Sequence, residues 1–303
     1  MARFFQFNQT SLVIALVILS LFITSSCSSS ADNRFWGKTQ APKENVFRYI
    51  SGSEPESLDP AVGTGQPEAR IYMALYDGLV EYHPKTMEPI PALAESWEIS
   101  RDGTEYLFHL RKDGKFSNGD PITARDFVYT FRRSLDPENA FRNANLAYYI
   151  KYAEAYNSAR SFVKDANGQF LLKTDAEEKE PAAAPAPADA PAAQPQQQTG
   201  QPDNFGPDTE FHRFIDAPER LTVPTSEKER AKLFEKDAKL KALVEGKQLI
   251  PVKAEDLGVE AIDDYTLRIK LYQPAPYFLD LLPHQFFRVL HRPTIEKFGK
   301  GWS

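Results

Sequence analysis

The chain has 303 residues, 42% hydrophobic and 26% charged, which is typical of a globular protein and excludes a wholly disordered chain. It carries 36 basic and 42 acidic residues, a net charge of -6, without a long basic block, which argues against nucleic acid as a partner. A single cysteine excludes a cysteine-rich zinc site and an intramolecular disulfide.

The first 26 residues have the pattern of an export signal. Arg3 precedes the almost wholly apolar run SLVIALVILSLFI, and small residues follow it up to Cys27. This run is shorter than the ~20 residues of a membrane-spanning helix, so we interpret residues 1–26 as a cleaved signal peptide. The stretch resembles the lipobox of bacterial lipoproteins, which implies that Cys27 carries a lipid and that residues 27–44 form a flexible tether. A chance cysteine after an ordinary signal site is the alternative.

The run SWEISRDGTEYLFHL, residues 96–110, predicts a β-hairpin. Apolar residues alternate along both of its strands, at Trp97, Ile99, Tyr106, Phe108 and Leu110. Between the strands, Asp102 and Gly103 can take the positive φ angles of a tight turn. The apolar face of this hairpin is therefore expected in the core.

A helix is predicted after the hairpin. Thr123 can cap its first turn, with Asp126 at the third helical position. Phe127, Phe131 and Leu135 recur every four residues, so their side chains share one face of the helix. We expect this aromatic stripe to cover the sheet.

The later run YTLRIKL, residues 265–271, alternates apolar and polar side chains and predicts a half-buried strand with one wet face. Arg268 and Lys270 lie on the face expected to be wet. We expect this strand to join the sheet of the hairpin, which gives a mixed α/β (α+β) unit.

We interpret residues 161–250 as an insertion within that unit. Residues 179–204 consist mostly of Ala, Pro and Gln, which predicts an exposed, disordered and semi-rigid linker. A proline-rich ligand for a partner domain is the alternative. Between the capping pair Ser226 and Glu229 and the stop signal Gly246, one charged helix is predicted on the surface, with a coiled-coil partner site as the alternative.

Motifs of common enzyme classes are absent from the sequence. The five histidines include no HExxH pair, and neither a GxSxG elbow, a GxxxxGK[ST] loop nor a GxGxxG turn occurs. We therefore expect no enzymatic activity, no metal and no cofactor. A hydrolase built on paired carboxylates is the alternative that sequence spacing leaves open.

Three long segments occur in an order that matches one known family. They are SGSEPESLDPAVGTGQPEARIYMALYDGLVEY, PALAESWEISRDGTEYLFHLRKDGKFSNGDPITARDFVYTFRRSLDP and DLGVEAIDDYTLRIKLYQPAPYFLDLLPH. Together they resemble the signature region of the family 5 solute-binding proteins, the peptide-binding lipoproteins of ABC importers. The resemblance implies a fold like that of type II periplasmic binding proteins. Residues 45–160 would form the first lobe and a small α+β subdomain, residues 251–303 would continue this subdomain and start the return to the first lobe, and the second lobe would be absent.

The resemblance also implies a function. Such proteins capture oligopeptides through the peptide main chain and deliver them to a membrane permease, here from an exported position, lipid-anchored at the cell envelope. The implied ligand contacts are Thr64, Gly65, Gln66 and Tyr149. From the residues alone, Thr64 and Gly65 also fit a plain turn, and Tyr149 a packed face of tyrosines. The alternative function is that of a truncated, binding-incompetent product or a lipoprotein interaction module.

Overall fold

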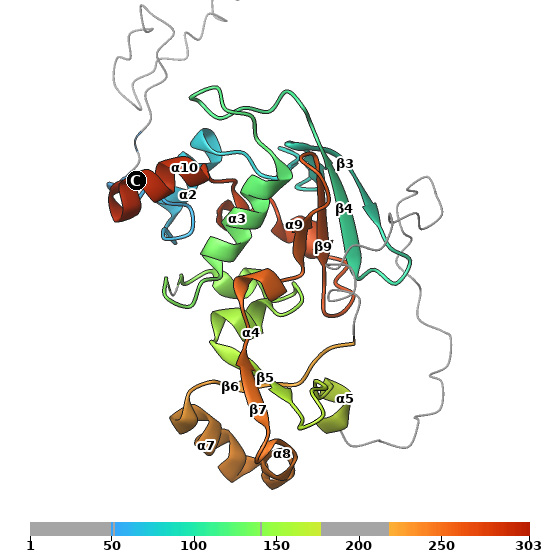
Figure 1. Cartoon of the computed structure of the whole chain (residues 1–303). Coiled ribbons are helices and arrows are strands. Elements are labelled where there is room, and N and C mark those ends of the chain that lie inside the picture. Colours follow the sequence, from blue (N-terminus) through green and yellow to red (C-terminus); the bar gives the residue numbers. More distant parts are fainter. Residues whose placement is uncertain (1–49, 51, 140, 177–217) are drawn as a thin grey trace, which may run out of the picture. The chain divides into compact units, whose positions relative to one another are not determined.

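The computed structural model describes residues 50, 52–139, 141–176 and 218–303 (Figure 1). The described residues from 52 onward belong to one compact unit. The predicted signal peptide, Cys27, the tether and the linker at 179–204 lie outside the described residues. Within the described part, none of the helices combines the length and the apolar character needed to cross a membrane.

A four-stranded antiparallel sheet contains the predicted hairpin. Its strands, in order across the sheet, are β3 (Ala94–Ile99), β4 (Glu105–Leu110), β9 (Thr266–Lys270) and β8 (Val259–Ala261). Phe108 pairs with Trp97 on one side and with Leu267 on the other, which confirms the hairpin and the addition of the later strand (Figure 1). Strands far apart in the sequence therefore build one sheet.

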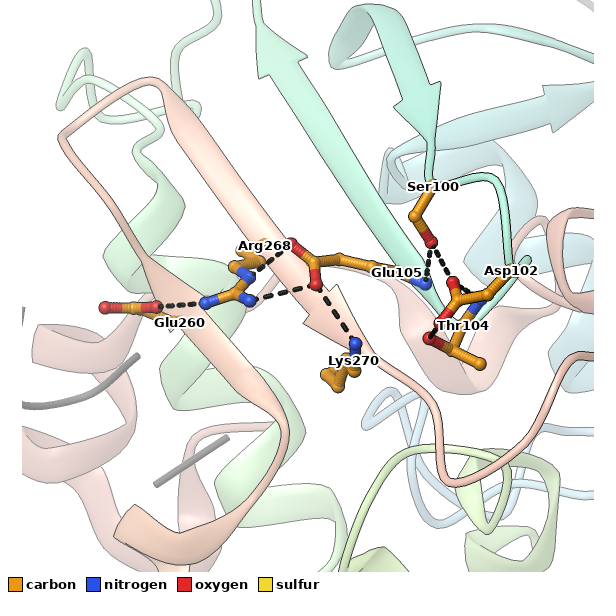
Figure 2. Close-up of polar contacts among 7 residues, drawn as sticks. All are labelled: Ser100, Asp102, Thr104, Glu105, Glu260, Arg268 and Lys270. Carbon is orange, nitrogen blue, oxygen red and sulfur yellow. Dashed lines mark hydrogen bonds and ion pairs between the residues drawn. The ribbon is translucent and has the colours of Figure 1, made fainter. Parts of the chain in front are cut away.

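The turn of the hairpin differs in detail from the prediction. Gly103 has a φ of 67°, but Asp102 does not take a positive φ. Instead, the Asp102 carboxylate accepts hydrogen bonds from the Ser100 hydroxyl at 2.6 Å and from the Thr104 N–H and hydroxyl at 3.1 and 2.8 Å (Figure 2). These bonds, that of Ser100 foremost, lower the pKa of Asp102 to about 2. Asp102 therefore suits this turn because its carboxylate accepts hydrogen bonds, and not because its backbone takes a positive φ angle.

Helix α3 (Ala124–Ser134) packs on strands β8 and β9, as expected for the predicted aromatic stripe. Phe127 and Phe131 are 0% and 2% exposed, and Leu135 just beyond the helix is fully buried. The Thr123 N–H and hydroxyl each donate to the Asp126 carboxylate at 2.8 Å. These two bonds to Asp126 fix the first turn of the helix that carries the apolar stripe.

The face of β9 predicted to be solvent-exposed is buried at its centre, while Thr266 and Lys270 at its ends are half-buried. Arg268 is 2% exposed, and its Nε and Nη2 donate to Glu105 at 2.6 and 2.9 Å (Figure 2). The Lys270 Nζ lies 3.2 Å from the same carboxylate, and Glu260 lies 3.8 Å from Arg268. Burial of a charge is costly unless it is paired, and these ion pairs across β4, β9 and β8 supply the partners.

A second sheet lies within the predicted insertion. It has the order β6 (Thr222–Pro224), β5 (Arg160–Lys164), β7 (Gln248–Pro251), all antiparallel. The expected boundary between residues 160 and 161 thus falls inside β5. Near this sheet, the Lys173 N–H donates to the Glu219 carbonyl at 2.9 Å and the two side chains form an ion pair at 3.1 Å. The chain therefore returns beside the point where it left.

The predicted single helix between Ser226 and Gly246 is two helices, α7 (Glu227–Lys236) and α8 (Ala238–Val244). Asp237 separates them, because its carboxylate accepts the Leu240 N–H at 2.8 Å and so caps a new helix. Gly246 follows with a φ of 75°, consistent with the predicted stop.

The remaining elements are short. They are α2 (Gln66–Leu75), the paired strands β1 (Val80–Tyr82) and β2 (Pro89–Pro91), α4 (Ala153–Asn157), α5 (Lys173–Ala176), α9 (Phe278–Leu281), α10 (Arg292–Phe298) and the 3-10 helices η3 (Ala144–Ala147), η4 (Ala254–Asp256), η5 (Gln285–Phe287) and η6 (Gly299–Gly301). Both α2 and α3 lie against η5, so the return segment of the chain connects them.

Candidate functional site

The predicted ligand loop lies directly before helix α2. Thr64 and Gln66 are exposed, whereas Gly65 between them is half-buried with φ -86° and ψ 163°. No hydrogen bond within the described chain uses the N–H or the carbonyl of Thr64. Within the described chain, these two backbone groups of the exposed Thr64 thus have no partner.

Asp59 holds the start of this loop. It is 2% exposed, and its carboxylate accepts the Ala61 N–H at 3.0 Å, while its carbonyl accepts the N–H groups of Val62 and Gly63 at 3.0 and 3.3 Å. Arg133 at the end of α3 pairs with the same carboxylate at 2.5 Å. The turn is thus anchored to the helix that covers the main sheet.

Gly63 is held from two further sides. The Gln285 Nε2 donates to the Gly63 carbonyl at 3.0 Å, and Gln285 itself is buried. Tyr72 of α2 is also buried, and its hydroxyl donates to the Ser57 carbonyl at 2.7 Å. A methyl group on Gly63 would overlap that hydroxyl, which explains why this position has no side chain. Burial is the main factor that raises the pKa of Tyr72 to about 12.

Glu68, also in the first turn of α2, lies next to Gly65. Its Oε1 accepts the Glu56 N–H at 2.9 Å, and a methyl group on Gly65 would overlap its carboxylate. The backbone N–H groups of Glu56, of Glu68 itself and of Gly65 lower the pKa of Glu68. An ionised carboxylate therefore lies buried behind the exposed loop.

Tyr149 belongs to a different group of contacts. It is half-buried, its ring meets the ring of Tyr277 edge to face at 5.3 Å, and its carbonyl accepts the Tyr272 N–H at 3.0 Å. The neighbouring hydroxyl of Tyr149, followed by burial, raises the pKa of Tyr277. No hydrogen bond, ion pair or ring contact among the described residues joins Tyr149 to the loop at Thr64, so the predicted ligand contacts form two groups.

A cavity of about 450 Å³ lies beside the second sheet. Tyr148, Tyr152, Arg160 and Tyr272 contribute to its walls, but Thr64, Gly65, Gln66 and Tyr149 do not. Its polar groups largely bind one another, since Arg160 donates to the Thr222 hydroxyl and carbonyl and Lys173 pairs with Glu219. In the described part of the chain, no group of three His, Cys, Asp or Glu residues could hold a metal ion.

Sequence reasoning missed the residues that support the loop: Arg133, Glu68, Tyr72 and Gln285. The sequence contains one signal for Glu68, because Pro67 and Glu68 follow Gly65 as a helix start with an acid in the first turn. Gln285 has no comparable local signal, since it lies 222 positions from Gly63.

Comparisons with known proteins identify relatives of this chain. The sequence-family model described as "Bacterial extracellular solute-binding proteins, family 5 Middle" matches residues 88–303. The periplasmic oligopeptide-binding protein OppA of Escherichia coli (strain K12) is 28% identical over 291 residues, which cover 96% of this chain and 36% of that protein. The dipeptide-binding protein DppE of Bacillus subtilis (strain 168) is 38% identical over 123 residues, 41% of this chain and 22% of that protein.

A solved structure shows a similar fold. The crystal structure of a periplasmic oligopeptide-binding protein from Borrelia burgdorferi (OppAIV) matches 82% of this chain and 32% of its own, with a TM-score of 0.50 and 25% identity. The predicted mixed α/β fold of the type II periplasmic binding protein kind is thereby confirmed. The chain spans about a third of the length of the relatives that it matches over most of its own length.

Proposed function

Because the chain belongs to the bacterial extracellular solute-binding proteins of family 5, we propose that it takes part in capturing oligopeptides outside the cytoplasm and in delivering them to the permease of an ABC importer. Members of this family bind substrates and are not enzymes, as the sequence predicted. Oligopeptides are the proposed ligand because relatives named for oligopeptide binding match most of this chain. Export by residues 1–26 and lipid attachment at Cys27 belong to the same proposal.

The observation that carries the proposal is that Thr64 is exposed and that its backbone N–H and carbonyl have no partner within the described chain. Its N–H and carbonyl can pair with the main chain of an extended peptide, as one strand pairs with another. Main-chain pairing tolerates varied side chains, because every peptide offers the same groups. The contacts of Asp59, Tyr72 and Gln285 hold the preceding turn before a ligand arrives, so less conformational entropy is lost on binding.

Titration calorimetry with the mature chain, residues 27–303 with Cys27→Ser, tests this function. The probe is a mixed pool of tri- to pentapeptides, and heat of binding at micromolar concentration is expected. No heat from a well-folded sample would contradict peptide binding by this chain and would favour the alternative of a binding-incompetent product or an interaction module.

A pair of variants tests the main-chain mechanism. Thr64→Ala keeps the peptide group and is expected to bind as the parent does, whereas Thr64→Pro removes the N–H donor and is expected to weaken binding about tenfold. Circular dichroism of both variants checks that they fold alike. Equal affinities of the two folded variants would refute recognition through the Thr64 N–H.

A further inference from the structure

The position of Glu68 in the first turn of helix α2 does not explain why its carboxylate is buried. An acid in the first turn of a helix interacts favourably with the helix dipole while it remains in water. Glu68 is only 7% exposed. Its Oε1 accepts one hydrogen bond, from the Glu56 N–H, whereas its Oε2 is buried and has no hydrogen-bond partner of normal geometry, although the N–H groups of Gly65 and Glu68 lie near enough to lower the pKa of the carboxyl. An oxygen of this kind normally has a partner, so its burial calls for a separate explanation.

The buried oxygen lies against Gly65. A methyl group at Gly65 would overlap Glu68 Oε2 and lie close to its Cδ. The φ of -86° at Gly65 is accessible to any residue, so glycine is not needed for its backbone angles. A side chain at this position would instead displace the Glu68 carboxylate, because the backbone of Gly65 approaches it closely.

The two ends of the exposed loop are therefore held by different side chains. Tyr72 and Gln285 hold Gly63, as described above. At Gly65 the neighbouring side chains are Glu68 and the adjacent Pro67. Glu68 in turn is fixed by the Glu56 N–H, twelve residues earlier in the chain. This contact connects the segment before the turn with the segment after it.

We propose that Glu68 is a positioning residue for ligand binding, which holds Gly65 so that the peptide groups of Thr64 face an incoming peptide. The inference rests on the proposed function, because it assigns a task to Glu68 within the same site. Glu68 itself touches no ligand in this arrangement. Its carboxylate acts through the backbone of the loop.

A double-mutant cycle between Gly65 and Glu68 tests the contact. The variants are Gly65→Ala, Glu68→Ala and the two combined, with Glu56→Gln as the matched control. The control removes a neighbouring carboxylate of the same charge but keeps the Glu56 N–H that Glu68 accepts. Two measurements are made on each protein: hydrogen exchange of the amides at 63–66 without ligand, and affinity for trialanine. Amides of β4 serve as the internal reference for global stability.

Gly65→Ala and Glu68→Ala are each expected to raise the exchange rates of the amides at 63–66 and to weaken trialanine binding by about tenfold. The exchange rates of the β4 amides are expected to stay unchanged. The double variant is expected to be no worse than either single one, because removal of the carboxylate makes room for the new methyl group. Glu68→Gln keeps an acceptor for the Glu56 N–H and is expected to restore part of the affinity. Glu56→Gln is expected to behave as the parent does.

Unchanged exchange at 63–66 in Glu68→Ala, or additive effects of the two substitutions, would overturn the positioning role. The two proposals fail in distinguishable ways. If the parent protein binds no peptide, the proposed function fails, while the exchange data still decide whether Glu68 holds the loop. If the parent binds and Glu68→Ala binds equally well, only the positioning role fails.

Discussion

The ion pairs between Glu105, Arg268 and Lys270 predict an ordered series of stabilities. Glu105 and Arg268 have side chains 6% and 3% exposed, while the Lys270 side chain is 19% exposed. Removal of one partner from a buried pair usually costs about 3–5 kcal/mol, because the remaining charge loses its compensation. The cost of each substitution therefore depends on which partners it leaves behind.

Glu105→Gln removes the carboxylate that both cations share, so we expect a loss of about 4 kcal/mol in the free energy of unfolding. Arg268→Met leaves Glu105 paired with Lys270 at 3.2 Å but removes the longer 3.8 Å contact with Glu260, so we expect about 3 kcal/mol. Lys270→Met removes the more exposed partner and should cost about 1 kcal/mol. The combined Glu105→Met and Arg268→Met variant should lose less than Glu105→Gln, because apolar residues replace both buried charges.

Urea unfolding followed by circular dichroism measures this series, provided that the dependence on urea concentration is the same in all variants. A larger loss for Arg268→Met than for Glu105→Gln would refute the reasoning, because the shared carboxylate would not be the centre of the network. Losses below about 1 kcal/mol in both would refute the burial on which it depends.

Two further predictions concern the packing of the core and the loss of folding stability at alkaline pH. Phe131→Ala should lower the free energy of unfolding by about 3–4 kcal/mol, and Phe131→Leu by clearly less; equal losses in urea unfolding would contradict a packing origin. Burial is the main factor that raises the pKa of Tyr152 from 10.0 to about 12. The neutral hydroxyl therefore contributes its full stabilisation of the folded state below pH 10, the pKa in the unfolded chain. This contribution is lost as the pH rises through 12. Tyr152→Phe should therefore flatten the loss of stability between pH 10 and 12 in alkaline unfolding, and an unchanged slope would contradict this.

Local patterns predicted the hairpin and helix α3 correctly. The alternation that includes Trp97 and Phe108 indicates the apolar face of the hairpin, and the four-residue spacing of Phe127 and Phe131 indicates the apolar face of the helix. The residues on these faces form the core. The same reasoning failed at Arg268. An alternating pattern marks a charged residue as facing water, but its partner Glu105 lies 163 positions away and no local pattern reveals it.

The break between α7 and α8 shows a different failure. The capping signals at Ser226 and Gly246 predict the two ends of one helix, whereas Asp237 between them accepts a backbone N–H and starts a second helix. The sequence contains that information, but aspartate in a charged helix is also common on the surface. The spacing of apolar residues fits both one long helix and two short ones, and the hydrogen bond accepted by Asp237 decides in favour of two.

The candidate site was only partly accessible from the sequence. Thr64, Gly65 and Gln66 came from a family resemblance, and their position before α2 follows from chain order. The buried support of this loop was not foreseen, because Tyr72 and Gln285 look like ordinary core and loop residues until the fold brings them to Gly63. Tyr149 remains a prediction from resemblance.

The closure at Lys173 and Glu219 has a consequence for how this sequence can change. The hydrogen bond and ion pair between these residues fix both ends of residues 174–218 at one place. For a chain closed in this way, each doubling of length costs only about 0.6 kcal/mol of closure entropy. A change of chain length between Ala176 and Ala217 should therefore cost little free energy of unfolding, and a fluorescent reporter could be inserted there while the sheets on either side keep their stability.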